Sequence, residues 1–196
     1  MKRVSLPAAL LVGITFATAP SYAQDFRGED QISGSLGGQI GLHGAPGGGL
    51  FAAEYGHRLS WATWLDLELD LGFGSGSACF VDNGRNMICT RSAGGQELDA
   101  IIGARWNFRT RHERLVPYMK LGGGLAFLFW PGFDNDGFAP VGRAAGGLKY
   151  FVLRNLGVGG EASLTMGPGI FGCGPGCATS DLYAAWSMMG GAEFVF

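Results

Sequence analysis

Alternation of apolar and polar residues is the dominant pattern of this chain. In the stretch 63–74, leucine alternates with aspartate or glutamate at every second position. The stretch 95–108 repeats this design, with Glu97, Asp99 and Arg105 opposite an apolar set. Successive side chains of a β-strand point to opposite faces, whereas a helix would scatter these residues around its circumference. Both stretches therefore predict β-strands with one apolar and one charged face.

Clusters of Gly, Pro, Asn and Asp divide the chain into eight such segments. Each is about as long as the roughly 9–11 residues that a tilted membrane strand needs, or longer. Where a segment holds several charges, they fall on one face, as expected when the two faces meet different surroundings. The predicted strands are 31–42, 49–58, 63–74, 95–108, 115–129, 138–152, 156–166 and 181–196.

Alternation alone does not say which face points inward. A soluble barrel buries its apolar face, and an outer-membrane barrel turns that face to lipid. Three features favour the membrane arrangement: aromatic residues near the segment ends, small residues on the polar faces, and connections that alternate between short and long. We therefore expect an all-β fold, an eight-stranded antiparallel up-and-down transmembrane β-barrel. The structural alternative is a soluble lipocalin-like secreted barrel, which would be extracted without detergent.

The N-terminus carries the pattern of a secretory signal. Lys2 and Arg3 precede the uncharged apolar stretch 4–19, and Ser21-Tyr22-Ala23 forms a small-residue cleavage box. This layout predicts a Sec signal peptide, residues 1–23, that is removed to leave the barrel domain, residues 24–196. The apolar stretch 121–133 is too short for a helical span and contains three consecutive glycines.

Composition narrows the choice of partners. The chain has 14 basic and 16 acidic residues, and removal of Lys2 and Arg3 leaves 12 against 16, a net charge near −4. Such a balance argues against nucleic acid, which binds basic surfaces. Only 15% of residues are charged and 36 are glycine, which suits a chain in contact with lipid.

The C-terminal sequence Gly190-Gly-Ala-Glu-Phe-Val-Phe196 ends a strand in phenylalanine, with Phe194 and Met188 in the same phase. Together with the signal sequence and the eight segments, it resembles the small eight-stranded outer-membrane barrels, the OmpA transmembrane-domain-like and OmpX/Ail-like proteins. The resemblance covers the whole mature chain. It implies the outer membrane of a Gram-negative cell, contact with its lipid and lipopolysaccharide, Phe194 and Phe196 as a signal to the barrel-assembly machinery, and loops that could hold a surface ligand.

On this interpretation the charged faces line the lumen. Buried charges must be paired, so we expect a network that fills the lumen and fixes strand register. The alternative is a narrow path for ions or protons. A cation at Asp66, Glu68 and Asp70 is conceivable, although pairing with Arg105 and Arg143 is favoured. The predicted network comprises Glu54, Arg58, Asp66, Glu68, Asp70, Glu97, Asp99, Arg105, Lys120, Arg143, Lys149, Glu161 and Glu193.

All four cysteines lie in predicted external loops: Cys79, Cys89, Cys173 and Cys177. Four cysteines permit three pairings. An oxidising exported compartment favours disulfides, and local pairs, 79 with 89 and 173 with 177, are the simplest arrangement. A four-thiolate zinc site is the alternative, although the spacing lacks paired C-x-x-C motifs.

No cofactor fingerprint, metal site or catalytic motif stands out. Lipid A deacylase barrels use a histidine and a serine two residues apart on one strand face, and none of His43, His57 and His112 has that neighbour. We therefore expect a non-enzymatic envelope protein with a structural or surface-interaction role. A lipid A-modifying barrel enzyme or a narrow channel is the alternative.

Overall fold

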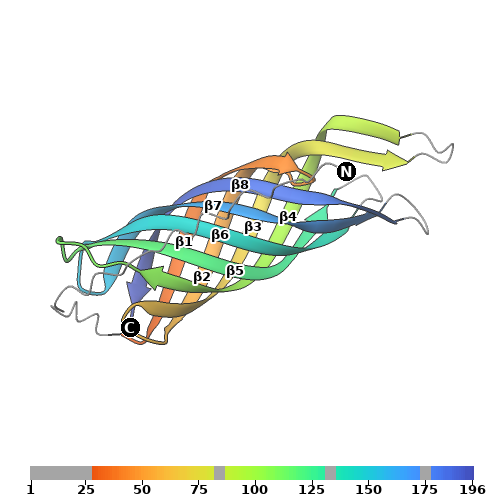
Figure 1. Ribbon diagram of the computed structural model, residues 1–196. Helices are drawn as coiled ribbons and strands as arrows, with labels where there is room; N and C mark the ends of the chain where they lie inside the picture. The colour runs from red at the N-terminus through yellow and green to blue at the C-terminus, as the bar shows by residue number, and fades with distance from the viewer. Residues whose placement is uncertain (1–27, 82–86, 131–135, 173–177) are drawn as a thin grey trace, which may run out of the picture.

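The computed structural model describes residues 28–81, 87–130, 136–172 and 178–196, and this part of the chain is eight long β-strands (Figure 1). The predicted signal peptide lies outside the described residues, so its removal stays a prediction. The strands are β1 Asp30–His43, β2 Gly47–Arg58, β3 Thr63–Val81, β4 Met87–Asn107, β5 Leu115–Phe129, β6 Gly137–Phe151, β7 Leu156–Gly172 and β8 Ala178–Val195.

The strands form one closed barrel in sequence order. Every strand pairs antiparallel with its neighbours in the chain, and β8 returns to pair with β1 from Gln31–Val195 to His43–Ala184. The predicted eight-stranded antiparallel barrel is confirmed. No helix of the described chain is long and apolar enough to cross a bilayer.

The two faces of β3 show which side is inside. Leu67 is 50% exposed and Leu69 is 48% exposed, whereas Asp66, Glu68 and Asp70 are at most 3% exposed. The same inversion holds around the barrel, where large apolar residues of every strand point outward. A soluble barrel would show the opposite order, so this exterior matches the arrangement of a barrel that meets lipid.

The β3–β4 hairpin is longer than the sequence predicts. Residues 75–94 were expected to form a loop, yet β3 continues to Val81 and β4 starts at Met87, with one register shift between Gly76 and Ala78. This ribbon projects beyond the other strands (Figure 1). The expected boundary was wrong because pairing between backbones continues where the alternation of side chains fades among Gly, Ser and Cys. Strands β7 and β8 extend past their expected ends in the same way.

The first connection, between β1 and β2, closes part of the barrel mouth. Gly44 takes a positive φ of 65° and bridges to Ala184 on β8. The chain then turns inward, so that Ala45 and Pro46 are buried and the side-chain amide of Gln39 donates to the Pro46 carbonyl at 2.9 Å. This loop is short because it lies across the lumen instead of extending away from it.

Glycine permits close contact between strands on the inner face. A Cβ on Gly124 of β5 would lie 1.9 Å from the Ala100 carbonyl oxygen and 2.9 Å from the Ile101 Cα, both on β4. On the outer face, a Cβ on Gly34 would meet nothing within 4 Å. Glycine is therefore needed at close contacts on the inner face, where the strongly curved wall brings backbones together. It is not needed on the outer face.

We predict that Gly124→Ala destabilises the barrel by about 1–3 kcal/mol, because the β4 backbone must shift to admit the methyl group. The matched change Gly34→Ala should alter stability by less than about 0.5 kcal/mol. Urea unfolding of the detergent-refolded protein, followed by tryptophan fluorescence, measures both. Equal midpoints for the two variants would contradict the close packing of β4 and β5.

Candidate functional site

The lumen contains the charged residues that the sequence assigns to it. Asp66, Glu68, Asp70, Glu97, Asp99, Arg105, Lys120, Arg143, Lys149 and Glu193 are all buried, and the side chains of Glu54 and Glu161 are each only 8% exposed. Arg58 differs. It ends β2 at the rim of the barrel, where its Nε donates to the Ser60 carbonyl at 3.4 Å.

Neighbouring strands place like charges side by side along the barrel wall. Glu54 is opposite Glu68 on β2 and β3, and Asp70 is opposite Asp99 on β3 and β4. On β4 and β5, Arg105 is opposite Lys120. Directly opposed like charges destabilise a strand pair. The wall therefore depends on charges that reach it from the other side of the lumen.

Arg143 of β6 neutralises the acids on β3 and β4. Its Nη1 bonds Glu68 at 2.7 Å and also Asp70, and its Nη2 bonds Asp99 at 2.9 Å. Its Nε donates to the Thr165 hydroxyl at 2.8 Å. One planar guanidinium thus holds three carboxylates, a role that suits the fixed fork of arginine donors.

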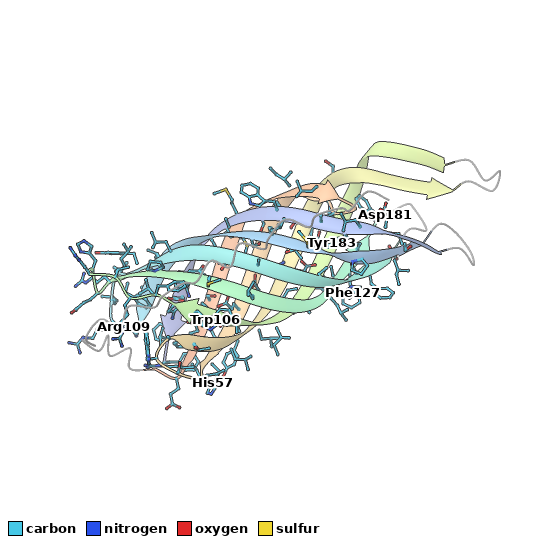
Figure 2. The ribbon with its side chains drawn as sticks, in the orientation of Figure 1. His57, Trp106, Arg109, Phe127, Asp181 and Tyr183 are labelled. Carbon is cyan, nitrogen blue, oxygen red and sulfur yellow. The ribbon has the colours of Figure 1, made fainter. Side chains whose placement is uncertain are left out.

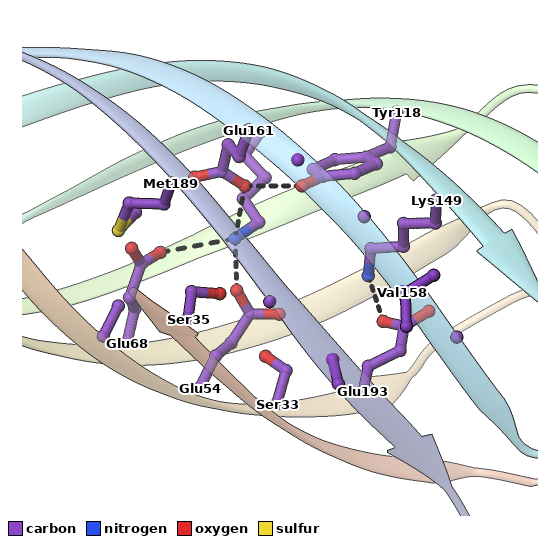
Figure 3. Close-up of a pocket in the computed structure, with 17 residues that line it drawn as sticks. Ser33, Ser35, Glu54, Glu68, Tyr118, Lys149, Val158, Glu161, Met189 and Glu193 are labelled. Carbon is purple, nitrogen blue, oxygen red and sulfur yellow. Dashed lines mark hydrogen bonds and ion pairs between the residues drawn. The ribbon is translucent and has the colours of Figure 1, made fainter. Parts of the chain in front are cut away.

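Lys120 of β5 occupies a second centre of the network (Figure 3). Its ammonium group bonds Glu54 of β2, Glu161 of β7 at 3.0 Å and Glu68 of β3 at 3.4 Å. The Tyr118 hydroxyl donates to Glu161 at 2.8 Å. The side chain of Lys120 therefore links four strands across the lumen.

Arg105 and Lys149 complete the pairing. Arg105 is fully buried and lies 3.1 Å from Glu54, 3.3 Å from Asp66 and 3.9 Å from Glu193, and its guanidinium stacks 5.2 Å over Trp64. Lys149 of β6 bonds Glu193 of β8. Each of the four lumen cations is thus in contact with at least one carboxylate.

Carboxylates outnumber cations in this network. Eight carboxylates face four cations, and one or both carboxylate oxygens of Asp66, Asp70, Asp99 and Glu161 have no hydrogen-bond donor among the described protein groups. Bound protons or water are the usual way to satisfy such acceptors. A cavity of about 40 Å³ beside Glu54, Lys120 and Glu161 has room for about two or three water molecules (Figure 3).

The acids of β3 are paired with arginines. Among the described residues, no group of three or more His, Cys, Asp or Glu side chains is arranged to hold a metal ion. Asp66, Glu68 and Asp70 lie on one face of β3, as expected, and Arg105 and Arg143 are in contact with them.

Two apolar layers enclose the charged network, and the sequence reasoning missed both. Toward the projecting hairpin, Leu128, Tyr183 and Val141 pack with smaller residues, and the Tyr183 hydroxyl donates to Glu97. At the opposite end, Trp64 packs with Phe151 and Val195. These residues share the phase of the charged face, so a large apolar residue in phase with the charges was the signal available in the sequence.

The remaining predicted residues are the four cysteines and the two C-terminal phenylalanines. Backbone register places Cys79 directly opposite Cys89 on the β3–β4 hairpin, while Cys173 and Cys177 lie outside the described residues. Both disulfides stay predictions. Phe194 and Phe196 point outward at the end of the chain, with ring centroids 6.3 Å apart.

His57 is the one described histidine with an organised polar environment. It lies at the rim, where its Nδ1 is 2.9 Å from Asp30, and the Tyr55 hydroxyl donates to the same carboxylate at 2.6 Å. Among the side chains that the structure describes, no serine is hydrogen-bonded to it. Figure 2 shows His57 at the same end of the barrel as Trp106 and Arg109, far from Tyr183.

No protein-family model and no curated protein matches the sequence. Solved structures do match. Neisserial surface protein A (NspA) gives a TM-score of 0.57 at 14% identity, covering 85% of this chain and 96% of that one. The N-terminal β-barrel domain of Pseudomonas aeruginosa OprF gives 0.51 at 16% identity, covering 86% and 99%. The outer membrane enzyme PagL gives 0.44 at 13% identity, covering 85% and 99%. At these identities the likeness shows a shared fold, that of the small eight-stranded outer-membrane barrels.

We predict that Arg143→Met destabilises the barrel by about 3–5 kcal/mol, because Glu68, Asp70 and Asp99 would be left buried without their cation. Adding Glu68→Gln, Asp70→Asn and Asp99→Asn should restore much of that loss. Arg154→Met, on an exposed connection, should change stability by less than about 0.5 kcal/mol. Urea midpoints of the refolded variants test this, and an Arg143→Met midpoint equal to that of Arg154→Met would contradict the network.

Proposed function

We propose that this protein is a non-enzymatic barrel of the outer membrane, with a closed lumen and a surface-interaction role for its projecting hairpin. The observation that supports it most strongly is the inverted distribution of side chains. Apolar residues cover the exterior, while paired charges fill the interior. The fold shared with Neisserial surface protein A and the OprF barrel domain agrees with this assignment.

Transport through the lumen fits the structure poorly. The charged layer lies between two apolar layers, and Arg105 in the charged layer and Leu128 and Tyr183 in the apolar layer next to it have no exposed surface. Eight strands enclose little more than their own side chains, and apolar constrictions oppose the entry of ions with their hydration water. We therefore favour a structural plug over an ion or proton path.

A lipid-modifying activity would need a nucleophile beside an oriented base. Asp30 orients His57 at the barrel rim, yet the described side chains provide no serine bonded to that ring. The arrangement of nucleophile, base and orienting acid is thus incomplete. The same residues have a structural role, because they tie the ends of β1 and β2 together.

The β3–β4 hairpin is the surface that we assign to interaction. Beyond Ser75 on β3 and Gln96 on β4, the two strands pair only with each other among the described residues, which leaves their outer edges unpaired within this part of the chain. Free strand edges are sites where an extended segment of a partner can add as a further strand. A disulfide between the opposed Cys79 and Cys89 would hold this ribbon in register.

Two measurements test the proposal. Membrane fractions should yield the protein only with detergent, and its electrophoretic mobility should change on boiling, as expected for a folded barrel. In planar bilayers the purified barrel should show no stable conductance steps. A soluble, unshifted band would contradict the membrane assignment, steady conductance would contradict the closed lumen, and altered lipid A mass spectra in a deletion strain would contradict the non-enzymatic role.

A further inference from the structure

The short connections at one end of the barrel are strongly basic. They join β2 to β3, β4 to β5 and β6 to β7, at the end where β8 terminates beside Asp30 (Figure 1). Together they carry one acid, Glu113, and four arginines, Arg109, Arg111, Arg114 and Arg154. We refer to Arg109, Arg111 and Arg114, all on the β4–β5 connection, as the basic rim.

Arginines of the rim differ from the cations of the lumen. All four lumen cations are ion-paired, whereas Arg109, Arg111 and Arg114 are exposed and have no carboxylate within ion-pair distance among the described residues. Their guanidinium groups are therefore available to an external anion. Three such groups on one connection also exceed what its single carboxylate, Glu113, can neutralise.

The basic rim has a defined scaffold. The Thr110 hydroxyl lies 2.8 Å from the His112 carbonyl oxygen and 2.7 Å from that of Leu115, and it shares its single proton between them, which holds the connection in a tight turn. The Phe151 amide donates to the Arg114 carbonyl at 2.8 Å and ties the turn to β6. The arginines thus project from a fixed backbone.

An apolar surface adjoins these charges. The Arg109 guanidinium lies 4.1 Å from the centroid of the Trp61 ring, which belongs to the β2–β3 connection and is 57% exposed. Leu59 and Phe108, at the same end of the barrel, are also exposed. Tryptophan favours the boundary between acyl chains and headgroups, so this pairing places a cation at headgroup depth.

We propose that the basic rim binds anionic phospholipid headgroups of the periplasmic leaflet. Guanidinium groups bind phosphate oxygens in pairs, and clustered basic residues beside a membrane attract anionic lipid. A lipid suits the site better than free phosphate, because the adjoining Trp61, Leu59 and Phe108 offer contact to its apolar part. The inference rests on the proposed membrane location, with the short connections on the periplasmic side as in outer-membrane barrels.

The test compares lipids bound by the full barrel in an uncharged detergent. Native mass spectrometry would count bound phosphatidylglycerol and phosphatidylcholine over a titration of each. We expect a preference for phosphatidylglycerol that falls on the order of 100-fold in Arg109→Gln/Arg111→Gln/Arg114→Gln.

The charge-conserving triple Arg→Lys variant should keep a preference, and Glu113→Gln should increase it. Boiling-sensitive mobility checks that every variant is a folded barrel, and its loss in the unmodified protein would refute the membrane proposal separately.

Three results would overturn the inference. The first is equal binding of the two lipids by the unmodified protein. The second is an unchanged preference in the triple glutamine variant. The third is displacement of phosphatidylglycerol by an equal concentration of inorganic phosphate, which would indicate a site for free anions.

Discussion

Closure of the barrel between β1 and β8 is the constraint on which the rest of the structure depends. Hydrocarbon offers no hydrogen-bond partners, so each strand must find two neighbours within the chain. The paired run from Gln31–Val195 to His43–Ala184 supplies the last of these contacts and removes both free edges of the sheet. Once the ring is closed, alternate side chains face either the lumen or the outside, and in this barrel the apolar set is the outer one.

Closure also makes the interior charges tolerable. Along the wall, Asp70 is beside Asp99 and Arg105 is beside Lys120, arrangements that repel when considered alone. The opposite charges come from distant strands, as Arg143 reaches Asp70 and Lys120 reaches Glu54 across the lumen. Pairing of the charges and closure of the ring therefore depend on each other, and the apolar layers at the two ends limit the access of water to the network. This mutual dependence explains how so much charge can remain inside the barrel.

Period-two patterning was enough to predict the core of each strand and which residues share a face, whereas the inward face had to be inferred from the aromatic residues, the small residues and the loop lengths. The two faces of β3 can be recognised from a few residues of sequence, because the alternation of leucines and acids is a local property. The ion-pair partner of each charge could not be predicted from the sequence. Contact between Glu68 and Arg143, for example, depends on barrel closure and on the register of every strand between them. The layer of Trp64, Phe151 and Val195 was not predicted, because these apolar residues share the phase of the lumen charges and the alternation of the strands does not mark them. The extent of β3 was underestimated because backbone pairing continues past the end of the alternation.

The account depends on which face meets lipid, and native tryptophans report on it directly. Trp186 points outward and is 37% exposed, whereas Trp64 points into the lumen and is 3% exposed. Variants that retain only one of these residues, with phenylalanine at the other tryptophan positions, can be reconstituted in bilayers whose acyl chains carry bromine, a contact quencher of tryptophan fluorescence. The structure predicts strong quenching of Trp186 and weak quenching of Trp64. The reverse order would show that the apolar faces point inward and that the barrel does not meet lipid as described.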